Sequence, residues 1–245
     1  MTLHRLVVAS SVTLLAGLLL AGCAAGPGGE NVDDTSVPTA SPGAPDGEMD
    51  DLEGVLLDDG RMFGVVSWGS SSCVPQVGDV SADAQTVTVA LVDPDPEGAE
   101  EQMCTADYAP RASIGALPDG VDPTKEITLQ VTYGDIADDV DLDGIPGATS
   151  TPGAATDYQP SAGWFDDGGL VLLTWGSSTC PPVVESVEGS GAAGTVVFTT
   201  DETRPCTKDM VPRGTIIAFT EDEVDDDAFT LTLSGGGLDG TVEVR

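Results

Sequence analysis

The sequence is poor in basic residues and contains a single histidine. Of its 245 residues, 8 are Lys or Arg against 42 Asp or Glu, and the formal net charge is -34. A nucleic-acid-binding protein needs a basic face for the phosphate backbone, so no nucleic-acid partner is expected. The only histidine, His4, lies in an N-terminal segment that we expect to be removed. The mature chain would then lack any histidine-dependent nucleophile and any histidine-ligated metal.

Aromatic residues and helical patterns are also scarce. Aromatic residues make up 4% of the chain, whereas glycine and proline number 31 and 17. After the N-terminal segment we find no stretch of about 12 residues with helical periodicity, while residues 86–89 and 230–233 alternate with period two. These patterns predict an all-β fold with many turns.

The N-terminus has the pattern of an export signal. A largely apolar run at 6–20 follows Arg5 and ends in Leu20-Ala21-Gly22-Cys23. Its length is short for a membrane span and typical of a signal-peptide core. The last four residues resemble the lipobox of bacterial lipoproteins. An ordinary secretory signal with a chance cysteine beside the cleavage site is the alternative.

The resemblance implies removal of residues 1–22 and acylation of Cys23. A diacylglycerol on the thiol, with any N-acyl chain, supplies the two or more chains that stable anchoring requires. The expected location is the extracytoplasmic face of the bacterial plasma membrane, and the membrane is the expected first partner. Residues 23–52 are rich in Gly, Pro, Ser, Asp and Glu, so we expect a disordered, lipidated tether there.

Two motifs occur twice, in the same order. Residues 65–75 (VVSWGSSSCVP) correspond to 172–182 (LLTWGSSTCPP), and 104–111 (CTADYAPR) correspond to 206–213 (CTKDMVPR). A duplication explains both matches. We therefore predict two small sandwich-like repeats, at 53–134 and 163–245, joined by an acidic Gly/Pro-rich linker at 135–162.

Short strands are predicted within each repeat. They are placed at 62–68, 86–92, 112–117 and 127–133 in the first, and at 170–175, 194–200, 215–220, 229–234 and 241–244 in the second. Whether the two repeats pack on each other is left open by the sequence.

Five cysteines divide into Cys23 and two per repeat. Four cysteines allow three pairings. The duplication favours Cys73–Cys104 and Cys180–Cys206, and export to an oxidising compartment permits both bridges. A zinc site of four cysteines is the alternative, but no CxxC pair is present.

The repeated motifs supply the candidate surface or structural residues, which are Trp68, Trp175, Asp107, Arg111, Asp209 and Arg213. The tryptophans suit either a small recognition patch or packing on the disulfides, and we favour packing. Each arginine is expected to pair with the aspartate of its own motif or to donate to turn carbonyls. The other interpretation is a bidentate grip on an anionic ligand, which so acidic a chain would repel.

Asp139, Asp141 and Asp143, followed by Gly144, form a DxDxDG string that resembles the start of an EF-hand-type calcium loop. Three alternate carboxylates before a glycine can wrap one hard cation. The twelfth position is Ser150 instead of glutamate, so a solvated acidic linker is the favoured interpretation. Calcium is the one possible cofactor; otherwise none is expected.

As a whole the chain resembles actinobacterial cell-envelope lipoproteins that carry a duplicated WGSSxC…CTxDxxPR module. The resemblance transfers no activity. We expect a non-enzymatic interaction module that binds an envelope polymer or protein. A divalent-cation-binding surface protein is the alternative, and a carboxylate-dependent hydrolase is a third possibility, because Asp and Glu are plentiful but aromatic sugar platforms are few.

Overall fold

The computed structural model describes residues 52–94, 103–201, 203–220 and 223–245. The chain divides into two units, 1–38 and 39–245, and every described residue belongs to the second. The predicted signal peptide, the lipidation site Cys23 and the tether up to residue 51 lie outside the described residues. In the described ranges, no helix is long and apolar enough to cross a membrane.

The predicted all-β class is confirmed. In the first copy, which spans 53–142, the strands are β1 (Glu53–Leu57), β2 (Met62–Gly69), β3 (Gln76–Asp83), β4 (Thr86–Val92), β5 (Ala109–Ala116), β6 (Ile127–Tyr133) and β7 (Ile136–Leu142). In the second copy, which spans 161–243, they are β8 (Ser161–Asp166), β9 (Gly169–Gly176), β10 (Val184–Ser190), β11 (Ala193–Phe198), β12 (Val211–Ala218), β13 (Thr230–Gly235) and β14 (Gly240–Glu243). A 3₁₀ turn, η1 (Asp58–Gly60), follows β1.

The two copies share one topology. Strands β1-β2-β5 form a three-stranded sheet and β3-β4-β6-β7 a four-stranded one. The second copy repeats this with β8-β9-β12 and β10-β11-β13-β14. Even the single parallel pairing recurs, between β4 and β6 and between β11 and β13. The structure thus confirms two sandwich-like repeats, and the duplication extends over all seven strands of each.

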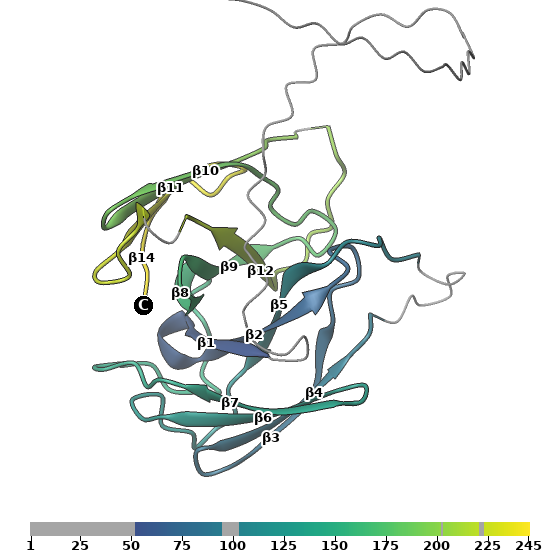
Figure 1. Ribbon diagram of the computed structural model, residues 1–245, viewed down its shortest axis with the longest axis vertical. Coiled ribbons are helices and arrows are strands. Elements are labelled where there is room, and N and C mark those ends of the chain that lie inside the picture. The colour runs from purple at the N-terminus through teal and green to yellow at the C-terminus, as the bar shows by residue number, and fades with distance from the viewer. Residues whose placement is uncertain (1–51, 95–102, 202, 221–222) are drawn as a thin grey trace, which may run out of the picture. The chain divides into compact units, whose positions relative to one another are not determined.

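The four sheets are stacked in layers, with the two three-stranded sheets in the middle (Figure 1). One core of buried side chains, centred on Phe63, Val89 and Leu129, fills the first sandwich. Another, centred on Leu172, Phe229 and Leu231, fills the second. Alternation along the outer strands provides the inward residues: β4 has the pattern of buried valines between exposed or half-buried neighbours.

A third core joins the copies. We call it the seam; its buried members are Val55, Leu57, Met62, Val66, Ala112, Phe165, Val171 and Leu173. The seam buries the second face of both inner sheets, which explains why the first six residues of β2 and of β9 are all buried. Approach is close here: a Cβ at Gly214 would lie 2.9 Å from the Cβ of Ala112, its counterpart in the first copy. The copies therefore pack together through an apolar interface.

The prediction of a linker over 135–162 is wrong at both ends. Strand β7 belongs to the first copy, and β8 already begins at Ser161, so the connection spans only 143–160. β7 is an edge strand whose buried residues, Val140 and Leu142, alternate with aspartates. Acidic residues on an exposed edge protect against pairing with other chains but weaken the strand pattern in the sequence.

The connection is fixed to the first copy at the η1 turn. Asp59 accepts hydrogen bonds from the backbone N–H groups of Thr149 and Ser150, both at 3.0 Å, and from Arg245 at 2.8 Å. Burial alone would raise the pKa of Asp59, but these hydrogen bonds, that from Arg245 first, hold it well below the usual range. The connection is thus held in place by a carboxylate that stays ionised.

Candidate functional site

The repeated motifs form one disulfide-bound loop pair in each copy, which we call the twin loops. The first consists of residues 69–73 and 104–108, and the second of 176–180 and 206–210. The predicted pairing is present in both: Cys73–Cys104 and Cys180–Cys206 each have a Cα–Cα distance of 5.6 Å. Each bridge fastens the segment before β5 or β12 to the loop that follows β2 or β9.

Arg111 and Arg213 stabilise the twin loops by hydrogen bonds to backbone carbonyls. Arg111 donates to the carbonyls of Cys73 at 2.8 Å and Trp68 at 3.2 Å. Arg213 donates to those of Cys180 and Trp175, both at 2.9 Å. Of the two structural roles predicted for the arginines, the structure shows the hydrogen bonds to turn carbonyls. Neither arginine forms an ion pair within the described ranges.

A glycine is required where each guanidinium lies against the backbone. A Cβ at Gly69 would come within 2.8 Å of the Arg111 guanidinium carbon, and one at Gly176 within 2.8 Å of that of Arg213. The Trp-Gly step of the motif therefore has a packing reason. Both planar cations stack on glycine backbone while their N–H groups reach the carbonyls.

The motif tryptophans belong to the seam. Trp68 makes an edge contact with Phe165 at 6.4 Å between ring centroids, and Trp175 makes one with Tyr158 at 5.3 Å. Both indoles pack against the seam core, partly buried. Trp68 joins the first loop to the second copy, and Trp175 joins the second loop to the connection. The tryptophans pack as expected, but the contacts shown are with the seam core and aromatic rings.

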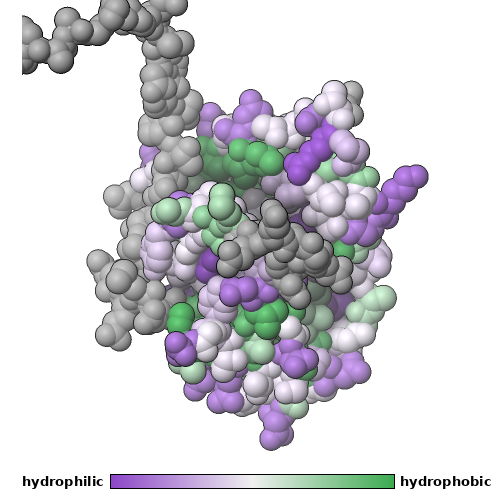
Figure 2. All heavy atoms as spheres, turned by 90° about the vertical axis from the view of Figure 1, so that its right-hand side faces the viewer, coloured by the Kyte–Doolittle hydropathy of each residue, from purple (hydrophilic) through white to green (hydrophobic). Residues whose placement is uncertain are grey.

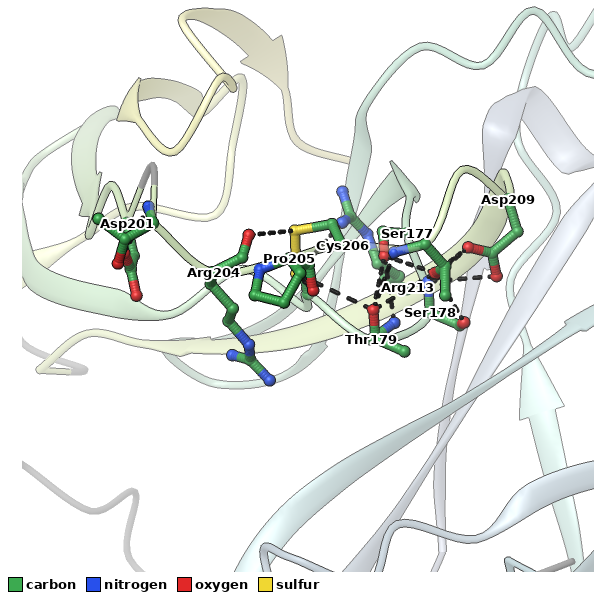
Figure 3. The surroundings of a disulfide bond; sticks show 12 residues. Ser177, Ser178, Thr179, Asp201, Arg204, Pro205, Cys206, Asp209 and Arg213 are labelled. Atoms are coloured by element: carbon green, nitrogen blue, oxygen red, sulfur yellow. Dashed lines mark hydrogen bonds between the residues drawn. A yellow bond between two sulfur atoms is a disulfide. The ribbon is translucent and has the colours of Figure 1, made fainter.

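The hydroxyls and the aspartate of each loop face outward. In the second loop, Ser177 and Thr207 lie 2.7 Å apart, Thr179 lies 3.3 Å from Thr207, and Asp209 accepts the Ser178 N–H at 3.2 Å (Figure 3). Arg204 and Asp201 point away from this cluster (Figure 3).

The first loop repeats the arrangement of hydroxyls and carboxylate. Ser70 lies 2.8 Å from Thr105, and Asp107 accepts the Ser71 N–H at 3.3 Å. In each loop the threonine hydroxyl also donates to the aspartate of its own motif.

Hydrogen bonds stabilise the ionised form of both aspartates. Donation from Ser71, and then from Thr105, lowers the pKa of Asp107 to about 2, and Ser178 and Thr207 do the same for Asp209. A carboxylate with so low a pKa is a weak proton acceptor at neutral pH. Each loop therefore presents an ionised aspartate beside hydroxyls.

Replacement of Thr105 by valine should raise the pKa of Asp107 toward its ordinary value, because one of its two main donors is lost. Asp209, untouched in the same molecule, is the internal control. Because the pKa of Asp107 is lower in the folded than in the unfolded protein, its ionised form stabilises the fold. This stabilisation is fully present above the unfolded-state pKa near 4 and is lost as the pH falls toward the folded-state pKa of about 2. Carbon-detected NMR titration of both carboxyls checks this. Equal midpoints for Asp107 in wild type and variant would contradict the assigned donor.

Comparison with known proteins gives no relative. No protein-family model, curated protein or solved structure matches the chain. The geometry of the described residues therefore carries the functional argument alone.

The predicted calcium loop does not form. Asp139 and Asp141 lie on β7, opposite Gln130 and Thr128 of β6, and Asp143 follows the strand end. A strand spaces alternate side chains in a row about 6.5–7 Å apart, whereas a calcium loop folds them around one point. Among the described residues, no group of three or more acidic, cysteine or histidine side chains could hold a metal ion.

Two features of the surface were not predicted. First, both twin loops expose a large apolar side chain at the same motif position, Tyr108 at 51% and Met210 at 57%. Alignment of the two motifs could have indicated this pair. Second, a hollow of about 740 Å³ lies at the border of the copies, between β1, the end of β7 and β8. No sequence signal indicates it, since distant segments form its walls.

Proposed function

We propose that the protein is a lipid-anchored extracytoplasmic protein that acts without catalysis, by binding an envelope polymer or protein through its twin loops. The observation that carries the proposal is the repetition of one exposed loop in both copies. Each loop combines a disulfide, a hydroxyl cluster, an ionised aspartate and an exposed apolar side chain. Two similar binding elements on one body suit a partner that is itself repetitive.

Three further observations support the proposal. The disulfides need an oxidising compartment, which agrees with export. The Thr–Asp pairs of the loops resemble part of a hydrolytic site, but a carboxylate pKa of about 2 makes each aspartate a poor base. The apolar residues visible on one face of the molecule lie in separate patches among polar ones (Figure 2), so contact through several small elements is a reasonable mode of binding.

The expected lipid anchor is tested at Cys23. Labelled fatty acid fed to expressing cells should appear on the wild-type protein and be absent from Cys23→Ser, because the thiol is the acceptor in the lipobox mechanism. The mature N-terminus, determined by mass spectrometry, should be residue 23. Equal labelling of both proteins, or a mature N-terminus elsewhere, would contradict the anchor.

The twin loops are tested by binding to isolated cell-envelope material. Tyr108→Ser or Met210→Ser should each weaken co-sedimentation with the envelope about 10-fold or more, since loss of one element removes the multivalent gain. The double variant should bind weakest. Val92→Ser, at a valine that is 47% exposed outside the loops, is the matched control and should bind as wild type does. If all four variants bind equally, the loops are not the contact surface.

A further inference from the structure

We propose that the hollow at the border of the two copies binds a primary ammonium group carried on a short apolar stem. The hollow is about 740 Å³, within the range of small-molecule sites. It is separate from the twin loops, so its test is independent of the proposed function.

The floor of the hollow is apolar and partly aromatic. Leu56 from β1, Leu142 from β7 and Phe165 from β8 are all buried, with exposures of 6%, 2% and 8%. Trp164 of β8 is half-buried and also lines the hollow. Such a floor accepts a short alkyl stem, and aromatic rings favour cations over anions because their faces carry negative charge.

The rim of the hollow is acidic. Glu53 begins β1, Asp141 lies near the end of β7 and accepts a hydrogen bond from Thr128 at 2.8 Å, and Asp143 follows the strand; both aspartates are exposed. The one basic residue in the lining, Arg245, donates to Asp59 at 2.8 Å, so its charge is already balanced. The hollow therefore suits an ammonium group on an apolar stem. The rim carboxylates would contact the ammonium group, and the apolar floor would contact the stem.

A second acidic hollow strengthens the preference for cations. It measures about 510 Å³, shares Trp164 and Phe165, and contains Asp166, Asp167 and Asp226. The aromatic pair therefore lies between two sets of carboxylates. In a chain of charge -34, the field at this surface attracts cations and repels anions.

Two other occupants fit less well. The chain's own predicted tether, 23–52, contains several acidic residues and no basic one, so the rim would repel it. A bare divalent ion would not use the apolar floor, and no group of three or more acidic side chains among the described residues could hold one.

The experiment uses the three tryptophans of the chain, whose indole N–H groups give three NMR cross-peaks. The protein is titrated with n-butylammonium chloride into the millimolar range, and Trp164→Phe assigns the reporter. We expect a saturable shift at Trp164 that exceeds the shifts of Trp68 and Trp175. Sodium butyrate, n-butanol and sodium chloride at equal concentration should not reproduce it.

The matched variants test the rim. Asp141→Asn with Asp143→Asn should raise the dissociation constant about five-fold, as loss of two exposed charge contacts predicts. Asp83→Asn with Glu188→Gln, on exposed positions of β3 and β10, removes the same charge elsewhere and should change it by less than about two-fold. The Trp68 and Trp175 peaks report that each variant remains folded.

Four results would overturn the proposal: equal shifts at all three indoles, an equal response to n-butanol, an unchanged dissociation constant in the rim variant, or an equal saturable shift with calcium chloride. The last would assign the rim to a divalent ion. None of them bears on the envelope binding of the twin loops.

Discussion

Removal of both disulfides should lower the free energy of unfolding by about 3–4 kcal/mol per bridge, as the chain-entropy model gives for loops of this size. The bridged cysteines are 31 and 26 residues apart in the sequence. Urea unfolding followed by tryptophan fluorescence, with and without a reducing agent, measures the loss. An unchanged midpoint after complete reduction would contradict it.

The two bridges should differ in accessibility. In the first bridge Cys104 is exposed but Cys73 is only 7% exposed, whereas in the second bridge Cys206 is exposed and Cys180 is half-buried. A thiolate can approach only the Cys104 sulfur of the first bridge but either sulfur of the second, so the bridge of the second copy should be reduced first under mild conditions. Alkylation followed by peptide mapping shows the order. A peptide that links Cys73 to Cys180 or to Cys206 would contradict the pairing itself.

The Cys→Ser double variants separate the two contributions. The pair at Cys73 and Cys104 and the pair at Cys180 and Cys206 serve as controls for each other, because both bridges close equivalent loops. Each double variant should be less stable than wild type by about 3–4 kcal/mol. Loss of stability in one copy only would indicate that its bridge acts on local structure and leaves the rest of the fold intact.

The sequence predicted the central strands because their apolar residues are unbroken or alternate clearly. β4 and β6 were predicted with their observed bounds, and β2, β9 and β13 to within one residue at each end. Five strands were missed: β1, β3, β7, β8 and β10. β1 is short although its last three residues are apolar and buried, and the other four carry weaker patterns. β3 has mostly exposed residues and β7 has three aspartates. In β8, three small residues (161–163) precede Trp164. Tertiary pairing with a stronger neighbour decides the structure of such segments.

The sites were predicted less completely than the strands. The bridges and the role of Arg111 followed from motifs that occur twice, so local sequence was enough. The seam could not be predicted from the sequence. The continuous apolar run in β9 indicates a strand buried on both faces, but it does not show which sheet covers the second face. The acidic hollow depends on Glu53, Asp143 and Trp164, which are far apart in the chain and meet only because the copies pack together.

Replacement of Leu173 by alanine should lower the free energy of unfolding by about 2–5 kcal/mol. Leu173 is fully buried in the seam, between the inner sheets of the two copies. The substitution would leave a cavity in the seam, and the close packing means that this cavity can close only if both copies move. Urea unfolding measures the change. A loss below about 1 kcal/mol would indicate that the seam is loosely packed.

The same seam should make the two copies unfold as one unit. Leu231→Ala affects a residue in the core of the second copy only, yet it should accelerate hydrogen exchange at the core amides of Val89 and Leu129 in the first. The reason is that unfolding of the second copy would expose the apolar seam face of the first, which costs about 25 cal/mol per Å². If exchange at Val89 and Leu129 stays at the wild-type rate while the second copy is destabilised, the copies are independent domains and the seam carries little coupling.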